Sequence, residues 1–413
     1  MKRLWTIGGI IVTALALACA GCGSSIDPID PNKPGGVAVK FGEPTQAQVT
    51  ALSQFGEALF NQSLGAKPNP VISPLSAFIA LSMAYDGAAG ATAQAFADVL
   101  GLSADEASEL VAYLLANLGS DDAGTILNLT NSAWLDDEFI VKQTWVDRLD
   151  GYHQASVFTT DLQNPATLKQ VNDWIKQHTG GLIPEMLESI DPYAVALLVN
   201  TLYLEAAWAQ EFYRLDSYES PFTTKDGRQV DAWFMTGGSQ GSYIKVGNQE
   251  GVLLPYKDGR LAFMAIMPGG GDLSLDPGSI TRWLHAAEPR DGLLVRMPKF
   301  HTEFGFDLVD PLTALGLGIA FTDRADFSAM GYSPLGSLCI GSAVQKVTMG
   351  VGEKGTEASA ATVIEVVPVS GWIGETQVTF DRPYIYAIVD TVTSVPLFIG
   401  VMEDPSLAPP SAV

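Results

Sequence analysis

The sequence predicts an α+β protein in which helices gather in the first half of the chain and strands dominate the second half. Two capping-box pairs, Thr45 with Gln48 and Ser103 with Glu106, begin segments of helical periodicity. From residue 194 onward, apolar runs of strand length alternate with turn-forming residues. Because 47% of the 413 residues are hydrophobic and residues 45–405 show no composition break, we expect one domain with a sizeable core.

The expected helices lie before residue 180. The first begins at Thr45, and the second follows Ser73, whose hydroxyl can cap a helix with Pro74 in its first turn. A third spans 103–118. The expected strands are 128–135, 194–204, 251–256, 261–268, 293–300, 378–390 and 396–402, and the pairs Asp226-Gly227 and Asp258-Gly259 predict hairpins.

The N-terminal segment reads as an export signal, residues 1–21, separate from the folded domain. A basic start is followed by an apolar run over 4–18 that is too short for a membrane span. Ala20-Gly21-Cys22 resembles the end of a bacterial lipobox, which predicts lipidation at Cys22, with Cys19 as the weaker candidate. The alternative is an ordinary cleaved signal. Residues 22–44, rich in Ser, Pro and Gly, predict a linker to a lipid anchor, and 406–413 predict a disordered tail.

Charge argues against polyanionic partners, and cysteine content argues against a disulfide within the domain. The 23 basic and 46 acidic residues give a net charge of −23, which argues against nucleic acid and heparin-like polyanions. Cys339 is the one cysteine after the signal region, so no disulfide is expected within the domain. The four histidines have no metal-ligand spacing, and no metal or cofactor is expected.

The segment 353–370 is the candidate functional element. It alternates as a strand, with small residues on one face: Thr356, Ala358, Ala360 and Thr362. Alanine is depleted in resident strands, whereas small side chains suit a segment that must slide between existing strands. Gly355 can supply a hinge ahead of it. The pattern predicts an exposed loop that is built to become a strand.

This hinge resembles that of the serpins, E-x-G-T-E-A-x-A-x-T. Further matches are Ser73-Pro74-Leu75-Ser76, Asn200 to Leu204 with Trp208, Phe321-Thr322-Asp323 and Phe380 to Tyr384. The resemblance covers about residues 45–405. It implies a large central mixed sheet, two further sheets, eight or nine helices and an exposed reactive-centre loop. It also implies a metastable, monomeric inhibitor of serine proteases that is not itself an enzyme.

The resemblance assigns roles to individual residues. Counting seventeen residues from Glu353 places the scissile bond between Val369 and Ser370, with Val366-Val367 and Gly371-Trp372 as alternative registers. Val369 suits a shallow apolar pocket of elastase type, and cysteine proteases remain possible targets. The residues that would contact the protease around this bond are Val366, Val367, Pro368 and Gly371. The hinge comprises Glu353, Gly355, Thr356, Glu357, Ala358, Ser359, Ala360, Ala361 and Thr362. The shutter that controls sheet opening comprises Ser73, Ser76, Asn200 and Gln345, with Gln345 where serpins often have histidine, and Trp208 belongs to the breach.

Two other hypotheses compete with inhibition. The runner-up is a non-inhibitory scaffold that binds a partner or is merely cleaved. The third is a hydrolase, because Gly237 to Gly241 matches G-x-S-x-G, but that motif requires a strand-to-helix elbow. Residues 242–246 predict a strand instead, so the sequence disfavours a hydrolase.

Overall fold

The computed structural model describes residues 9–20, 39, 41–118, 120–122, 124–181, 183–212, 217–334, 336–356 and 376–410. Within these ranges the α-helices are α1 (Gln46–Ser63), α2 (Pro74–Tyr85), α3 (Gly90–Leu100), α4 (Ala104–Leu118), α5 (Gln143–Gly151), α6 (Pro165–His178), α7 (Ser279–His285) and α8 (Val309–Leu312). No helix of the described chain combines the length and the apolar character needed to cross a membrane.

The strands form one large sheet and smaller ones, which confirms the predicted α+β class. The central sheet has eight strands: β1 (Gly9–Ala20), β3 (Ser120–Asp122), β4 (Thr125–Asp136), β6 (Ala155–Thr160), β7 (Ala194–Ala207), β15 (Phe300–Asp307), β17 (Ser337–Gly352) and β18 (Gly355–Thr356). It is mixed, because β4 and β6 run parallel while its other pairs are antiparallel.

A seven-stranded sheet contains β2 (Val71–Ile72), β10 (Ser242–Val246), β11 (Gln249–Pro255), β12 (Leu261–Met267), β13 (Ala287–Pro289), β20 (Tyr384–Asp390) and β21 (Pro396–Met402). A four-stranded sheet contains β8 (Tyr218–Thr223), β9 (Gln229–Ser239), β14 (Leu293–Pro298) and β19 (Thr376–Thr379). A small pair joins β5 (Ile140–Val141) to β16 (Gly331–Tyr332).

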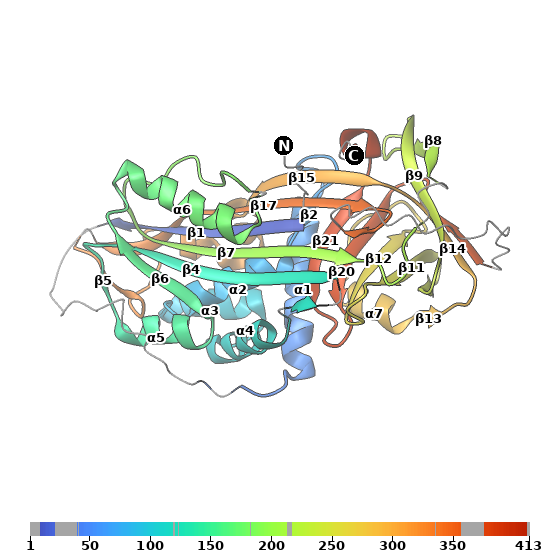
Figure 1. Ribbon diagram of the computed structural model, residues 1–413. Coiled ribbons are helices and arrows are strands. Elements are labelled where there is room, and N and C mark those ends of the chain that lie inside the picture. The colour runs from blue at the N-terminus through green and yellow to red at the C-terminus, as the bar shows by residue number, and fades with distance from the viewer. Residues whose placement is uncertain are drawn as a thin grey trace.

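The helix starts confirm the capping predictions. Thr45 and Gln48 form a reciprocal capping box at α1, and the Ser73 hydroxyl accepts from the amide of Ser76 at 3.1 Å to cap α2. At α4, the Ser103 hydroxyl and amide both donate to the Glu106 carboxylate. Every residue of α2 is buried, so this helix lies inside the molecule beneath the central sheet (Figure 1).

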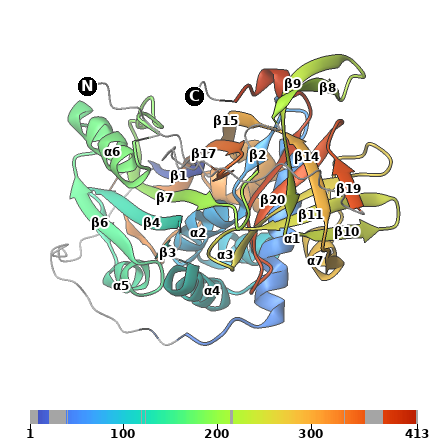
Figure 2. The ribbon, with the colours of Figure 1, turned by 45° about the vertical axis from the view of Figure 1, so that its right-hand side comes forward.

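Helices cover both faces of the central sheet. On one face, α2 and its neighbours belong to the main core; on the other, α6 lies across the strands (Figures 1 and 2). A second apolar cluster fills the space under α6 and includes Trp134, Val171, Ile175, Leu197 and Val199. The sheet is therefore buried on both faces along β7, whose first nine residues are all buried.

Four segments differ from the sequence-based expectations. The run 378–390 is split into β19 and β20 because Pro383 cannot donate a ladder hydrogen bond, and 293–300 ends β14 and begins β15. The expected tail contains a 3-10 helix, Pro405–Leu407, followed by buried Ala408. Most notably, Gly9–Ala20, expected to lie apart from the domain, forms β1 in the central sheet. An uncharged apolar run of this length is ambiguous between helix and buried strand.

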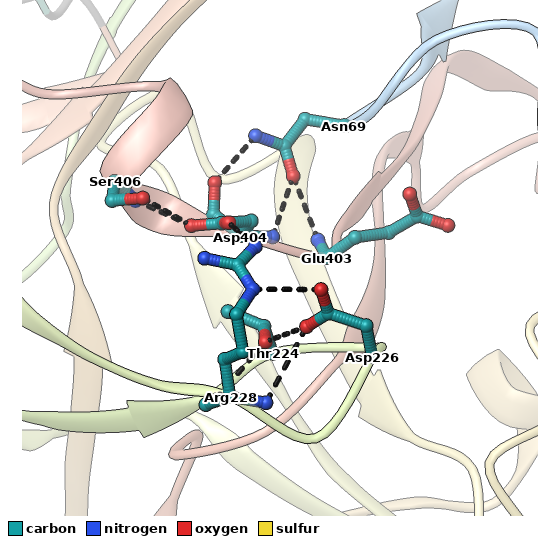
Figure 3. A network of polar contacts seen from close by, with 7 residues as sticks. All are labelled: Asn69, Thr224, Asp226, Arg228, Glu403, Asp404 and Ser406. Carbon is teal, nitrogen blue, oxygen red and sulfur yellow. Dashed lines mark hydrogen bonds and ion pairs between the residues drawn. The ribbon is translucent and has the colours of Figure 1, made fainter.

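A polar network fastens the end of β21 to the β8–β9 hairpin (Figure 3). Buried Asn69 accepts from the amides of Glu403 at 2.8 Å and Asp404 at 2.9 Å, and its Nδ2 donates to the Asp404 carbonyl at 2.7 Å. The Asp404 carboxylate lies 3.0 Å from Nη2 of Arg228, whose Nε is 2.7 Å from Asp226. Asn69 has φ of 52°, a conformation in which asparagine is favoured.

Replacing Asn69 with alanine is expected to lower the free energy of unfolding by roughly 3 kcal/mol, because two buried amides and one carbonyl lose their partner. Denaturant unfolding of the purified protein measures the change. Asn69→Asp is the matched control: it keeps both acceptor contacts and the turn preference but cannot donate to Asp404. A loss for Asn69→Ala no larger than that for Asn69→Asp would contradict this account.

Candidate functional site

The predicted loop begins at the end of β17, the 16-residue strand between β15 and β1. After a two-residue turn at Glu353 and Lys354, β18 reverses direction and enters the central sheet. Gly355 pairs with Gly352 on β17 and with Ala207 on β7, and Thr356 pairs with Val351 and Ala206. The start of the hinge therefore already lies between β17 and β7 as a strand.

Gly355 is required by a close backbone approach. A Cβ at this position would lie 2.0 Å from the carbonyl oxygen of Ala206, so any other residue would force β18 away from β7. The sequence suggested glycine for its conformational freedom. The structure adds this steric reason, which holds for any side chain.

Thr356 sits in an aromatic environment. Its side chain is fully buried and its hydroxyl bonds to the Tyr256 hydroxyl. The Tyr256 ring stacks on Trp208 with centroids 4.8 Å apart and planes 5° apart. Trp208 in turn donates from Nε1 to the Gly352 carbonyl at 2.8 Å, and its amide donates to the Lys354 carbonyl at 2.9 Å. Trp208, the predicted breach residue, thus holds both sides of the turn that leads into the hinge.

Glu353 is anchored by charge and by hydrogen bonds. Its carboxylate accepts from the Lys299 ammonium at 2.9 Å and from the Ser217 hydroxyl at 2.7 Å, and its carbonyl accepts from the Phe212 amide at 2.8 Å. Burial by itself raises the pKa of Glu353, but the bonds from Lys299 and Ser217 outweigh burial and hold the pKa below its ordinary value. Hydrogen bonds therefore hold both the side chain and the backbone of Glu353 in this turn.

The structure brings the four predicted shutter residues together at the start of α2. Gln345, on β17, accepts from the Ser73 amide and donates to the Ser73 carbonyl, both at 3.0 Å. The Ser73 hydroxyl donates to the Leu397 carbonyl at 2.6 Å, and the Ser76 hydroxyl bonds to Oδ1 of Asn200 on β7. All four residues are buried. The amide of Gln345 thus joins β17 to α2 by two hydrogen bonds.

Sequence reasoning missed the continuation of this network. Asn200 donates to Asn131 of β4 at 2.7 Å, and Asn131 donates to the His153 carbonyl at 2.7 Å. The His153 ring contacts the carboxylate of Asp86, at the other end of α2, at 2.9 Å. Arg148 lies 2.7 Å from the same carboxylate. The available clue was a polar Asn131 within an alternating strand, but only strand pairing places it opposite Asn200.

Most predicted loop residues lie outside the described residues. These are Glu357, Ala358, Ser359, Ala360, Ala361, Thr362, Val366, Val367, Pro368, Val369, Ser370 and Gly371, and Cys22 lies outside as well. The G-x-S-x-G segment joins the end of β9 to β10, which is a strand-turn-strand arrangement, so the elbow that a hydrolase needs is absent there. Within the described ranges, no group of three or more His, Cys, Asp or Glu side chains could hold a metal ion.

Comparison with known proteins bears on the same features. The family model described as serpin (serine protease inhibitor) matches residues 50–405. Serpin-ZXA of Oryza sativa subsp. japonica is 31% identical over 367 residues, covering 83% of this chain and 92% of that protein. The native-state structure of tengpin, a thermophilic serpin, aligns with a TM-score of 0.80 at 28% identity, covering 89% of this chain and 96% of the other.

Structural likeness extends to a protein that is named for binding a small molecule. The complex of thyroxine-binding globulin with thyroxine aligns with a TM-score of 0.75, covering 86% of this chain and 99% of the other, at 21% identity, which shows a shared fold alone. The family model goes further, since it spans residues 50–405 and so includes the shutter, the breach and the hinge. The relative from Oryza sativa is 31% identical and covers 83% of this chain. The chain belongs to the serpin family of serine protease inhibitors.

Proposed function

We propose that the protein is a suicide-substrate inhibitor, not an enzyme, that traps an elastase-like serine protease. The observation that carries this proposal is β18: the first strand residues of the hinge already lie between β17 and β7. The residues that follow in the sequence are small, so they suit continued entry between the same two strands. A charged or bulky hinge would favour a scaffold.

The chemistry starts at Val369. The protease serine attacks its carbonyl and forms an ester, the bond to Ser370 breaks, and the departing amine takes the proton. The new end at Val369 is then free, so the segment from Thr356 onward can extend β18 along β7. Fourteen strand residues span about 45 Å, and the tethered protease is carried a comparable distance. Distortion of its active site then stops hydrolysis of the ester.

Insertion is favourable because it completes hydrogen-bond ladders on two strands and buries apolar faces. The uncut form is metastable relative to the cut form, and inhibition depends on insertion outrunning hydrolysis. In the full chain, β1 lies between β7 and β17, so insertion also requires that β1 leave this position.

Sequence features support a proposed target and location. Val369 fits a shallow apolar pocket, and Pro368 keeps the preceding backbone extended for binding. Cysteine proteases also form acyl-enzymes and are a second class of target. We place the protein outside the cytoplasm, anchored to a bacterial membrane through a lipid on Cys22, acting as a monomer.

A non-inhibitory scaffold is the second candidate, and one cavity favours it. A polar pocket of about 400 Å³ lies between α6 and the central sheet, lined by Asn128, Thr130, Gln177, His178, Gly180 and Tyr203. A small ligand held there would give the protein a binding role that does not depend on trapping.

The deciding experiment incubates residues 45–413 with neutrophil elastase and analyses the mixture by denaturing electrophoresis and mass spectrometry. The expected result is a covalent band at the summed mass together with a released peptide that begins at Ser370. Val369→Arg is the matched control, and it should move trapping from elastase to trypsin because an arginine fits the acidic primary pocket of trypsin and not the shallow pocket of elastase. Cleavage without a covalent band across a panel of serine and cysteine proteases would favour the scaffold.

A further inference from the structure

Strand β1 occupies the centre of the main sheet. Figure 1 shows it between β17 and β7, and it is antiparallel to both. Its residues pair with β7 from Leu204 to Ala194 and with β17 from Thr348 to Ser337. This is the same gap that β18 enters at its other end.

β1 pairs with β7 and β17 in the register that a lengthened β18 would have. On β7, Thr356 pairs with Ala206, so continuing β18 places Ala358 opposite Leu204, where Gly9 pairs. On β17, Thr356 pairs with Val351, so residue 359 would lie opposite Thr348, where Ile10 pairs. Both neighbours give the same offset, since 358 − 9 and 359 − 10 both equal 349. The direction along β7 is also the same.

The alignment reaches the shutter. Thr13 pairs with Asn200 and Gln345, and Thr362 would take that position in an inserted loop. Where the loop carries Glu365, the N-terminal segment has Ala16, and Gly9–Ala20 contains no charged residue. Leu197, the residue of β7 that pairs with Ala16, is buried. An uncharged strand enters such a gap without the cost of burying a carboxylate.

We propose that residues 9–20 are an internal competitor of the reactive loop, so that a chain retaining them cannot trap a protease and their removal arms the inhibitor. This proposal rests on the inhibitory function proposed above. With β1 in place the sheet has no free position, so a protease that cuts the loop is released by hydrolysis. A chain that keeps its N-terminal segment is therefore inert toward the proteases around it, and inhibition begins only where the segment is removed.

The position of β1 is tested first by a disulfide, independently of any protease. Full-length chain is made by cell-free synthesis without membranes, in a background of Cys19→Ser, Cys22→Ser and Cys339→Ser. Ala14→Cys with Val344→Cys should oxidise to a disulfide, because these residues pair directly and paired strands bring Cα atoms within bonding range. Ala14→Cys with Gly350→Cys is the out-of-register control and should stay reduced. No disulfide in the first pair, or equal yields in both, would overturn the proposal.

The competition is tested next by weakening β1 in the full chain. Ala14→Pro removes a ladder donor in the middle of the strand, whereas Ala14→Val keeps it. We expect Ala14→Pro to form at least about tenfold more covalent complex with elastase than Ala14→Val, since 1.4 kcal/mol of lost competition gives that factor. Its Tm should fall by roughly 10 °C, because a resident strand of the central sheet is lost.

The outcomes separate this proposal from the proposed function. If the wild-type full chain traps elastase as well as residues 45–413 do, β1 does not compete and the inference is wrong. If neither chain traps any protease but the disulfide forms and Ala14→Pro lowers Tm, β1 fills the gap while the inhibitory function fails. In that case the competition proposal is overturned along with it.

Discussion

Thr356→Arg is expected to abolish covalent trapping while leaving cleavage of the loop intact. Thr356 is fully buried between β17 and β7, with its hydroxyl on Tyr256. An arginine there has no carboxylate to pair with among these contacts, and an unpaired buried charge costs several kcal/mol. The hinge must then leave the sheet, insertion slows relative to ester hydrolysis, and we expect the yield of complex to fall by about 100-fold or more.

The measurement is the ratio of complex to cleaved protein after reaction of residues 45–413 with elastase. Thr356→Ser is the matched control, because it keeps the hydroxyl that bonds to Tyr256 and adds no bulk. Thermal unfolding of each uncut variant shows whether the domain remains folded. Trapping by Thr356→Arg at the level of Thr356→Ser would mean that the hinge need not enter the sheet through this position.

Asp86→Ala is expected to lower the free energy of unfolding at pH 7 by about 3–5 kcal/mol, the usual effect of removing one partner from a buried ion pair. The side chain of Asp86 is fully buried at the end of α2. Its carboxylate contacts Arg148 at 2.7 Å, His153 at 2.9 Å and the Ser108 hydroxyl at 2.9 Å. The backbone carbonyl of His153 also accepts a hydrogen bond from Asn131. The loss of the Asp86 carboxylate should therefore reach the shutter and ease opening of the sheet.

The same group predicts a pH dependence. Burial alone would raise the pKa of Asp86, but hydrogen bonds and charges from His153 and Arg148 outweigh burial and lower it. A lowered folded-state pKa gives stability that is present above the unfolded-state pKa, near 4, and is lost as pH falls through the folded-state pKa. Asp86→Asn lacks this ionisation. The stability difference between wild type and Asp86→Asn should therefore be largest near pH 7 and shrink below pH 4, as urea unfolding can measure. A difference that does not change with pH would contradict this assignment.

The local elements of the protein could be predicted from sequence because each depends on neighbouring residues. The capping boxes at Thr45 and Ser103 depend on side chains three residues away, and the strands depend on alternation within a few residues. The hinge motif and the resemblance that it carries are likewise contiguous in the chain. The family, the fold class and the starts of α1, α2 and α4 were therefore available without coordinates.

Only the tertiary structure decided what lies beside what. Strand pairing places Asn131 beside Asn200 of the shutter, and the far end of α2 places Asp86 beside His153. These residues are far apart in sequence. Gly355 is needed because β7 passes next to it, a contact more than a hundred residues distant. The apolar run at residues 9–20 suits a signal, a helix or a buried strand equally by composition, and only a vacant position with two complementary edges makes it a strand of the central sheet. A local sequence pattern does not specify which distant segments pair with each other, and that pairing decides these contacts.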